Sequence, residues 1–161
     1  MSTRSMIIIK VKPEHIGKTI KFNAKKLPVK LTGWGSEKVR SKCKPTVLEK
    51  PYIGIYCHWD GYPSGVGSTL VDNFADYDTA LNLIAGGYCS IVSDGEVRHY
   101  ANRYGEKWDW IKPMQSDTPP ICSSVLYAYV FKNGKWGCAK VEAKKIGKIR
   151  AVKEWIDGSE Y

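Results

Sequence analysis

The sequence contains no long hydrophobic run, and none of its apolar stretches approaches the roughly 18 residues that a helix needs to cross a bilayer. The early stretch at residues 6–9 is also too short for the core of a secretory signal peptide. There is no Gly-x-Ser-x-Gly elbow of a hydrolase, and no phosphate loop that ends in Gly-Lys-Ser/Thr. These absences predict a cytoplasmic protein without a cofactor.

Paired cysteines at the two-residue spacing of a zinc knuckle are absent too. The five cysteines are odd in number and widely spread, which favours reduced, mostly buried thiols over a disulfide framework. Cys57, His58, Cys89 and His99 are candidate zinc ligands, but a closed site needs four that converge. Cys57 and His58 are neighbours that point to opposite faces of a strand, so we expect no bound metal.

Acidic residues are scarce at both ends of the chain. Residues 1–50 carry 13 Lys and Arg against 3 Asp and Glu, and residues 132–161 carry 8 against 4. Residues 51–131 are acidic, with 4 against 9, and the formal net charge is +9. This asymmetry predicts a positive surface for nucleic acid or an acidic protein face, with a solvated lysine face as the alternative. The basic candidates near the end of the first block are Lys38, Arg40, Lys42 and Lys44.

Hydrophobic periodicity predicts an α+β fold in a single domain, with a mainly antiparallel sheet packed against a central helical segment. Apolar residues at 70, 74, 77, 81 and 84 predict one amphipathic helix or two abutting ones. Ser68 is the candidate cap at the start, and Asp76 or Asp78 is the candidate cap of a second segment. The Lys-Asn-Gly-Lys sequence at 132–135 predicts a type I′ hairpin. Strands are expected at residues 6–11, 18–22, 28–31, 52–60, 88–92, 124–131 and 136–141. We expect residues 1–50 to form a basic, β-rich part with a long exposed connection at 32–50, and residues 51–161 to form the α+β core with the C-terminal hairpin.

The stretch at 54–63 packs aromatic, imidazole, carboxylate, glycine and proline residues together. Strand alternation predicts that Cys57 and Trp59 face the core, while Tyr56, His58 and Asp60 share the other face. A histidine beside a carboxylate begins a general-base pair, which leaves a small hydrolase using His58 and Asp60 as one alternative. Turn formation at Asp60 and the following glycine explains the same residues without catalysis. The glycine-rich run at 61–67 predicts a tight turn with positive φ, or else a nest for an anion.

Aromatic and basic side chains alternate between residues 98 and 110, as they do on surfaces that bind single-stranded nucleic acid. Protein-interface hot spots have the same composition, and so does core packing with snorkelling lysines. The candidates in this cluster are Arg98, Arg103, Lys107, Trp108 and Trp110.

The segment Tyr56-Cys57-His58-Trp59-Asp60-Gly61-Tyr62-Pro63, followed by Gly67 and Leu70, resembles a family of small proteins from phages, prophages and other mobile elements. That family has a Y-x-H-W-D-G-Y-P signature, and the resemblance extends loosely over residues 52–138. In this chain we expect Trp59, Asp60, Gly61, Pro63, Gly67 and Leu70 to build the fold, which leaves Tyr56, His58 and Tyr62 as candidates for binding.

The resemblance implies a mobile-element origin and no enzymatic activity. Small accessory proteins of such elements are often inhibitors of host defence, including anti-CRISPR proteins. The expected partner is therefore a host defence protein, such as a CRISPR effector or its nucleic-acid complex, whose surface the chain would occupy. The alternatives are a nucleic-acid-binding protein that uses the basic N-terminal region and the Tyr/Trp/Arg cluster, and the small hydrolase.

Overall fold

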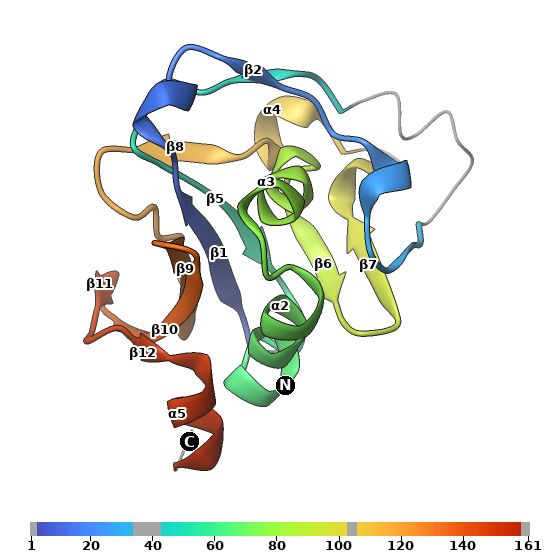
Figure 1. Cartoon of the computed structure of the whole chain (residues 1–161). Coiled ribbons are helices and arrows are strands. Elements are labelled where there is room, and N and C mark those ends of the chain that lie inside the picture. Colours follow the sequence, from blue (N-terminus) through green and yellow to red (C-terminus); the bar gives the residue numbers. More distant parts are fainter. Residues whose placement is uncertain (1–2, 34–42, 103–105, 159–161) are drawn as a thin grey trace.

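The computed structural model describes residues 3–33, 43–102 and 106–158, and Figure 1 shows it coloured along the sequence. The strands are β1 (Ser5–Lys10), β2 (Thr19–Ile20), β3 (Lys30–Leu31), β4 (Thr46–Val47), β5 (Tyr52–Cys57), β6 (Cys89–Val92), β7 (Glu96–His99), β8 (Met114–Ser116), β9 (Tyr127–Lys132), β10 (Lys135–Glu142), β11 (Lys145–Ile146) and β12 (Arg150–Ala151). The helices are α2 (Ser68–Asn73), α3 (Tyr77–Ala85), α4 (Trp108–Ile111) and α5 (Val152–Asp157), with short turns η1 (Pro13–His15), η2 (Ala24–Lys26), η3 (Pro63–Gly67) and η4 (Tyr100–Asn102).

A large, mostly antiparallel sheet has the strand order β11-β10-β9-β1-β5-β6-β7-β3, with β12 added on β10 and β8 on β5. Parallel pairing joins β1 to β9, β5 to β6 and β3 to β7. A separate pair is formed by β2 and β4. The prediction of a mixed α+β fold is therefore confirmed.

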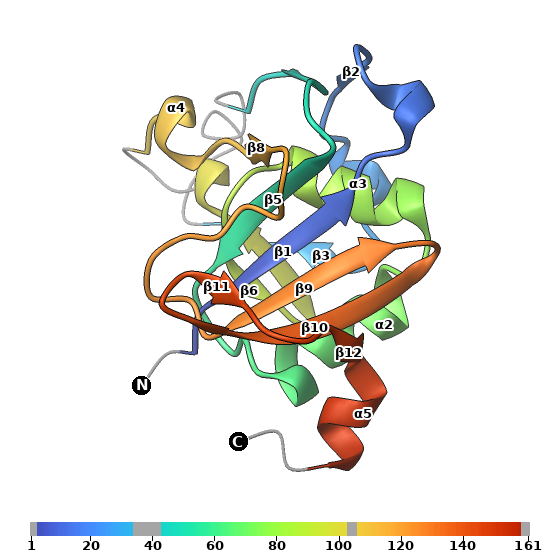
Figure 2. The same cartoon turned by 90° about the vertical axis from the view of Figure 1, so that its left-hand side faces the viewer.

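Strand β1 lies at the centre of the sheet, between β5 and β9. Its run of three isoleucines is buried on both faces, because helices cover one face and later loops cover the other. Figure 2 shows α2 and α3 on one side of β1 and β9, and the connection from β8 to β9 on the other. A strand from the basic first block thus bridges two strands from the rest of the chain.

The apolar stripe at 70–84 is confirmed as two abutting helices, α2 and α3, that end and restart around Phe74. Asp76 caps α3, since its carboxylate accepts the backbone N–H of Thr79 at 2.8 Å. Ser68 does not cap α2: the helix continues from the π-helical turn η3, and its N-cap residue is Gly67. The prediction of a Ser68 cap is wrong because the chain is already helical before that residue.

The C-terminal hairpin of β9 and β10 is confirmed, with Asn133 and Gly134 at φ 54° and 77° as a type I′ turn requires. Helix α5 then packs against the sheet, and the Trp155 indole donates to the Cys138 carbonyl at 2.7 Å. In the described ranges, the connection at 32–50 is not wholly exposed, because β4 pairs with β2 and Leu48 is fully buried. None of the helices in the described part of the chain is long and apolar enough to span a membrane.

Candidate functional site

The signature segment leaves the sheet as soon as β5 ends at Cys57. Asp60 adopts φ 55°, and the next residue, Gly61, approaches the N-terminal segment so closely that an added Cβ would lie 2.7 Å from the Thr3 carbonyl oxygen. The Gly61 N–H donates to that oxygen at 2.8 Å, while the buried Tyr129 hydroxyl donates to the Gly61 carbonyl at 2.6 Å. The signature therefore ties the end of β5 to the start of β1 and to β9.

The glycines of the run at 61–67 serve close packing, and the predicted positive φ falls on Asp60 instead. A Cβ at Gly65 would meet the Asp60 carbonyl oxygen, and one at Gly67 would lie 2.9 Å from Val152. Pro63 begins η3, and both Pro63 and Leu70 are buried. Gly61 and Gly67 therefore pack against the start of β1, against β9 and against the start of α5.

Trp59 is 46% exposed, so the prediction that it faces the core is wrong. Alternation holds only within a strand, and the regular pairing of β5 stops two residues earlier. The indole instead lies edge-on to the His58 ring, with centroids 4.7 Å apart and an interplanar angle of 90°. Cys57, by contrast, is fully buried as predicted.

Tyr56 and His58 form a hydrogen-bonded pair on the sheet face opposite the helices. The Tyr56 hydroxyl lies 2.7 Å from Nδ1 of His58. The Tyr56 ring also contacts the Tyr88 ring at a centroid distance of 5.7 Å, which extends the aromatic surface onto the start of β6. Together with Trp59 these rings form a continuous run of aromatic groups, which we call the aromatic edge (Tyr56, His58, Trp59 and Tyr88).

Arg4 comes next to this edge through strand pairing. The register between β1 and β5 sets Met6 against Tyr56 and Ser5 against Cys57, so its continuation brings Arg4 opposite His58. The backbone there is fixed, because the Leu126 N–H donates to the Arg4 carbonyl at 2.9 Å. Nε of Arg4 is buried without a hydrogen-bond partner in the described part of the chain.

The electrostatics of the pair reflect burial first and Arg4 second. Burial lowers the pKa of His58, and the positive charge of Arg4 lowers it further. Burial raises the pKa of Tyr56, and Arg4 acts in the opposite direction. At neutral pH the edge therefore presents a neutral imidazole and a protonated phenol beside a cation.

The general-base pair is not formed. Among the described residues, no hydrogen bond or ion pair joins His58 to Asp60: the first pairs with Tyr56, and the second accepts from the Tyr62 hydroxyl at 3.3 Å. The candidate zinc ligands do not converge either. No group of three or more His, Cys, Asp or Glu side chains in the described ranges could hold a metal ion.

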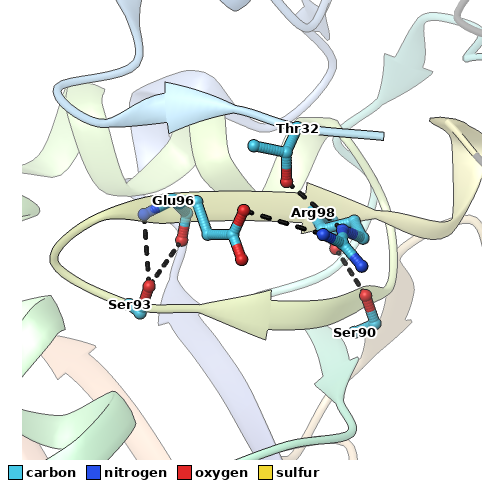
Figure 3. A network of polar contacts seen from close by, with 5 residues as sticks. All are labelled: Thr32, Ser90, Ser93, Glu96 and Arg98. Carbon is cyan, nitrogen blue, oxygen red and sulfur yellow. Dashed lines mark hydrogen bonds and ion pairs between the residues drawn. The ribbon is translucent and has the colours of Figure 1, made fainter. Parts of the chain in front are cut away.

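Arg98 belongs to a polar network that joins the ends of three strands (Figure 3). Its Nε donates to the Thr32 hydroxyl at 3.2 Å, and its guanidinium lies 3.7 Å from the Glu96 carboxylate. The Ser90 hydroxyl donates to the Arg98 carbonyl at 3.3 Å, and Ser93 closes the turn between β6 and β7 through Glu96. These contacts give Arg98 a role in holding the edge of the sheet together.

The aromatic cluster at 98–110 divides between core and surface. Trp108 is buried in a small cluster with Ala101 and Ile111, whereas Trp110 is 65% exposed. The Lys107 ammonium lies over the Trp110 ring, 5.1 Å from its centroid. Four predicted binding residues lie outside the described residues: Lys38, Arg40, Lys42 and Arg103.

Lys44 lines a groove of about 410 Å³ between residues 44–49 and the segment from α4 to β8. Lys112 and Gln115 lie on its other wall, and Trp110 projects from the same short helix. This groove is at the Tyr52 end of β5, because β8 pairs there, and the aromatic edge is at the other end. The structure thus places Lys44 and Trp110 on a different surface from Tyr56 and His58.

Sequence reasoning missed Arg4 and Tyr88. Their contacts with the signature depend on pairing between strands far apart in the chain, which no local pattern reveals. The local signal was the high density of aromatic, glycine, proline and charged residues at 54–63. It predicts a well-defined local structure, but it does not show which distant residues contact that structure.

No protein-family model, no curated protein and no solved structure matches this chain.

Proposed function

We propose that this chain is a non-enzymatic binding protein of a mobile element, which inhibits a host defence system by occupying a protein or protein–nucleic-acid surface. The observation that supports the proposal most is the exposed indole of Trp59 within the aromatic edge, beside the cation of Arg4. Tryptophan, tyrosine and arginine are the residues that dominate binding energy at interfaces. The likeness of the signature to mobile-element proteins supplies the biological setting.

The rigidity of the site also supports binding. The backbone that carries Trp59 and His58 is hydrogen bonded to β6 through the Cys89 and Ser90 carbonyls at 3.1 and 3.0 Å. Gly61 anchors the turn that follows. A preformed surface loses little conformational entropy on association, so its exposed rings contribute efficiently to affinity.

The proposal is tested by mixing the protein with purified CRISPR effector complexes from a panel of types and measuring complex mass and target cleavage. We expect a stable complex with one effector and a loss of cleavage that follows its formation. A chain that binds no effector and leaves cleavage by all of them unchanged would contradict the proposal.

A second candidate function is direct nucleic-acid binding through the Lys44 groove. It is favoured by Lys44 on the groove wall and by the exposed Trp110, whose ring could stack on a base, whereas Lys112 on the other wall lies 3.6 Å from the Asp109 carboxylate. Binding that rests on phosphates weakens steeply as salt rises. Titration of labelled single-stranded oligonucleotides at several salt concentrations is therefore the test, with Lys44→Ala and Trp110→Ala as variants. Affinity that is independent of both residues removes this candidate.

A further inference from the structure

Arg4, whose Nε has no hydrogen-bond partner in the described part of the chain, lies beside the aromatic edge and indicates a specific ligand chemistry. We propose that Arg4 and His58 bind one phosphate group of a single-stranded nucleic acid, with Tyr56 holding the His58 ring in place and Trp59 stacking on an adjacent base. The inference deepens the proposed function, because it names the chemistry that the partner presents at this surface.

The first argument is the state of Arg4. Its Nε is buried and has no hydrogen-bond partner in the described part of the chain, although a buried guanidinium group normally finds one. Leaving one N–H of a charged group unsatisfied is costly, and an oxyanion bound at the same guanidinium would offset that cost. The backbone on either side of Arg4 is held by the Gly61 and Leu126 N–H groups, so the cation is kept at this place.

The second argument is the arrangement of neutral donors next to the cation. When the Tyr56 hydroxyl donates to Nδ1 of His58 across 2.7 Å, the ring proton stands on Nε2 and is available to an incoming ligand. Arg4 then supplies charge and a planar fork of donors, which suits phosphate geometry. A bound anion also favours the imidazolium form, so binding and protonation of His58 reinforce each other.

The third argument concerns what lies beside the phosphate position. The Trp59 indole is in edge contact with His58 and is nearly half exposed, which leaves its surface open for a base. Stacking of a base on an aromatic side chain strengthens binding by about tenfold or more and tolerates any sequence. The carboxylates of an acidic peptide could pair with Arg4, but such a peptide has no base to stack on the neighbouring Trp59 indole.

The test follows the His58 ring by NMR while inorganic phosphate, a short oligothymidylate or a poly-glutamate peptide is titrated into the intact protein. We expect phosphate and oligothymidylate to raise the pKa of His58, and oligothymidylate to bind about tenfold more tightly through stacking. Arg4→Gln should weaken both ligands at least about tenfold. Trp59→Ala should reduce only the advantage of the oligonucleotide. Arg150→Gln is the matched control, since Arg150 lies over the Trp155 ring elsewhere, and should change nothing.

Three results would overturn the inference. The first is a His58 ring that none of these ligands shifts, and the second is phosphate binding that is unchanged in Arg4→Gln with a native near-UV circular dichroism spectrum. The third is a preference for poly-glutamate, or equal affinity for inorganic phosphate and the oligonucleotide, which assigns the site to another source of anion. Effector binding is measured on the same variants. If the protein binds an effector but not phosphate or oligothymidylate, the phosphate site is wrong while the proposed function stands.

Discussion

His99 shows how one buried residue can make the stability of the fold depend on pH. It is fully buried, and its Nε2 donates to the Leu83 carbonyl at 2.9 Å. Its Nδ1 is buried and has no hydrogen-bond partner among the described residues. The ring packs against Phe22 and fills the space beside Gly86, where a Cβ would collide with it. Burial lowers its pKa to about 4, so the folded protein holds this ring neutral where the unfolded chain would protonate it.

The sign of the resulting stability change follows directly. The unfolded chain takes up a proton near pH 6.5 and the folded chain only near pH 4, so acid favours unfolding between these values. We expect the free energy of unfolding to fall by about 3 kcal/mol over that range because of His99. Urea denaturation at a series of pH values measures it, with His99→Phe as the comparison. Identical pH slopes in the two proteins would contradict the account.

Gly61 is the residue on which the signature turn depends most. A Cβ there would lie 2.7 Å from the Thr3 carbonyl oxygen and 2.8 Å from the Ser5 Cβ. We expect Gly61→Ala to destabilise the fold by about 1–3 kcal/mol, because the start of β1 must move away. Gly95→Ala is the control, since nothing lies within 4 Å of a Cβ at that position. Thermal unfolding compares the two, and equal losses would show that the close approach is unimportant.

At the scale of secondary structure, the sequence predicts elements best where the pattern is local. The helical stripe, a second cap at Asp76 or Asp78 and the Asn-Gly hairpin were all predictable, because each depends on residues within a few positions of one another. The structure departs from the prediction where the exact end of a strand or the start of a helix determines the role of a residue. Trp59 leaves the core because β5 ends early, and α2 needs no Ser68 cap because η3 already supplies its first turn.

The Asp76 cap provides a test at this scale. Its carboxylate accepts from the Thr79 N–H and hydroxyl, both at 2.8 Å, and these bonds hold the pKa of Asp76 below its usual value. We expect Asp76→Ala to lower the free energy of unfolding by about 1 kcal/mol. Ser68→Ala, which removes no capping bond, should cost about 0.5 kcal/mol or less. Chemical denaturation of both variants measures the difference, and a larger loss for Ser68→Ala would refute the assignment of the caps.

At the scale of the whole molecule, the basic and aromatic residues that are candidates for binding do not lie together in one site. Lys44 and Trp110 lie at one end of β5, and Arg4 and Trp59 lie at the other. The candidate site could be foreseen only in part: Tyr56 and His58 were visible in the signature, but Arg4 needed the strand register. Function follows from such assembled surfaces, which composition alone does not locate.

The measurement that tests the proposed function most directly is the affinity of Trp59→Ala for any effector in the CRISPR panel with which the wild-type protein forms a complex. Trp110→Ala is the matched control, because its indole is even more exposed but lies at the other end of β5. We predict that Trp59→Ala loses at least about 2 kcal/mol of binding free energy, as hot-spot residues do, while Trp110→Ala stays near wild type. Wild-type affinity for Trp59→Ala, with the loss confined to Trp110→Ala, would contradict the account.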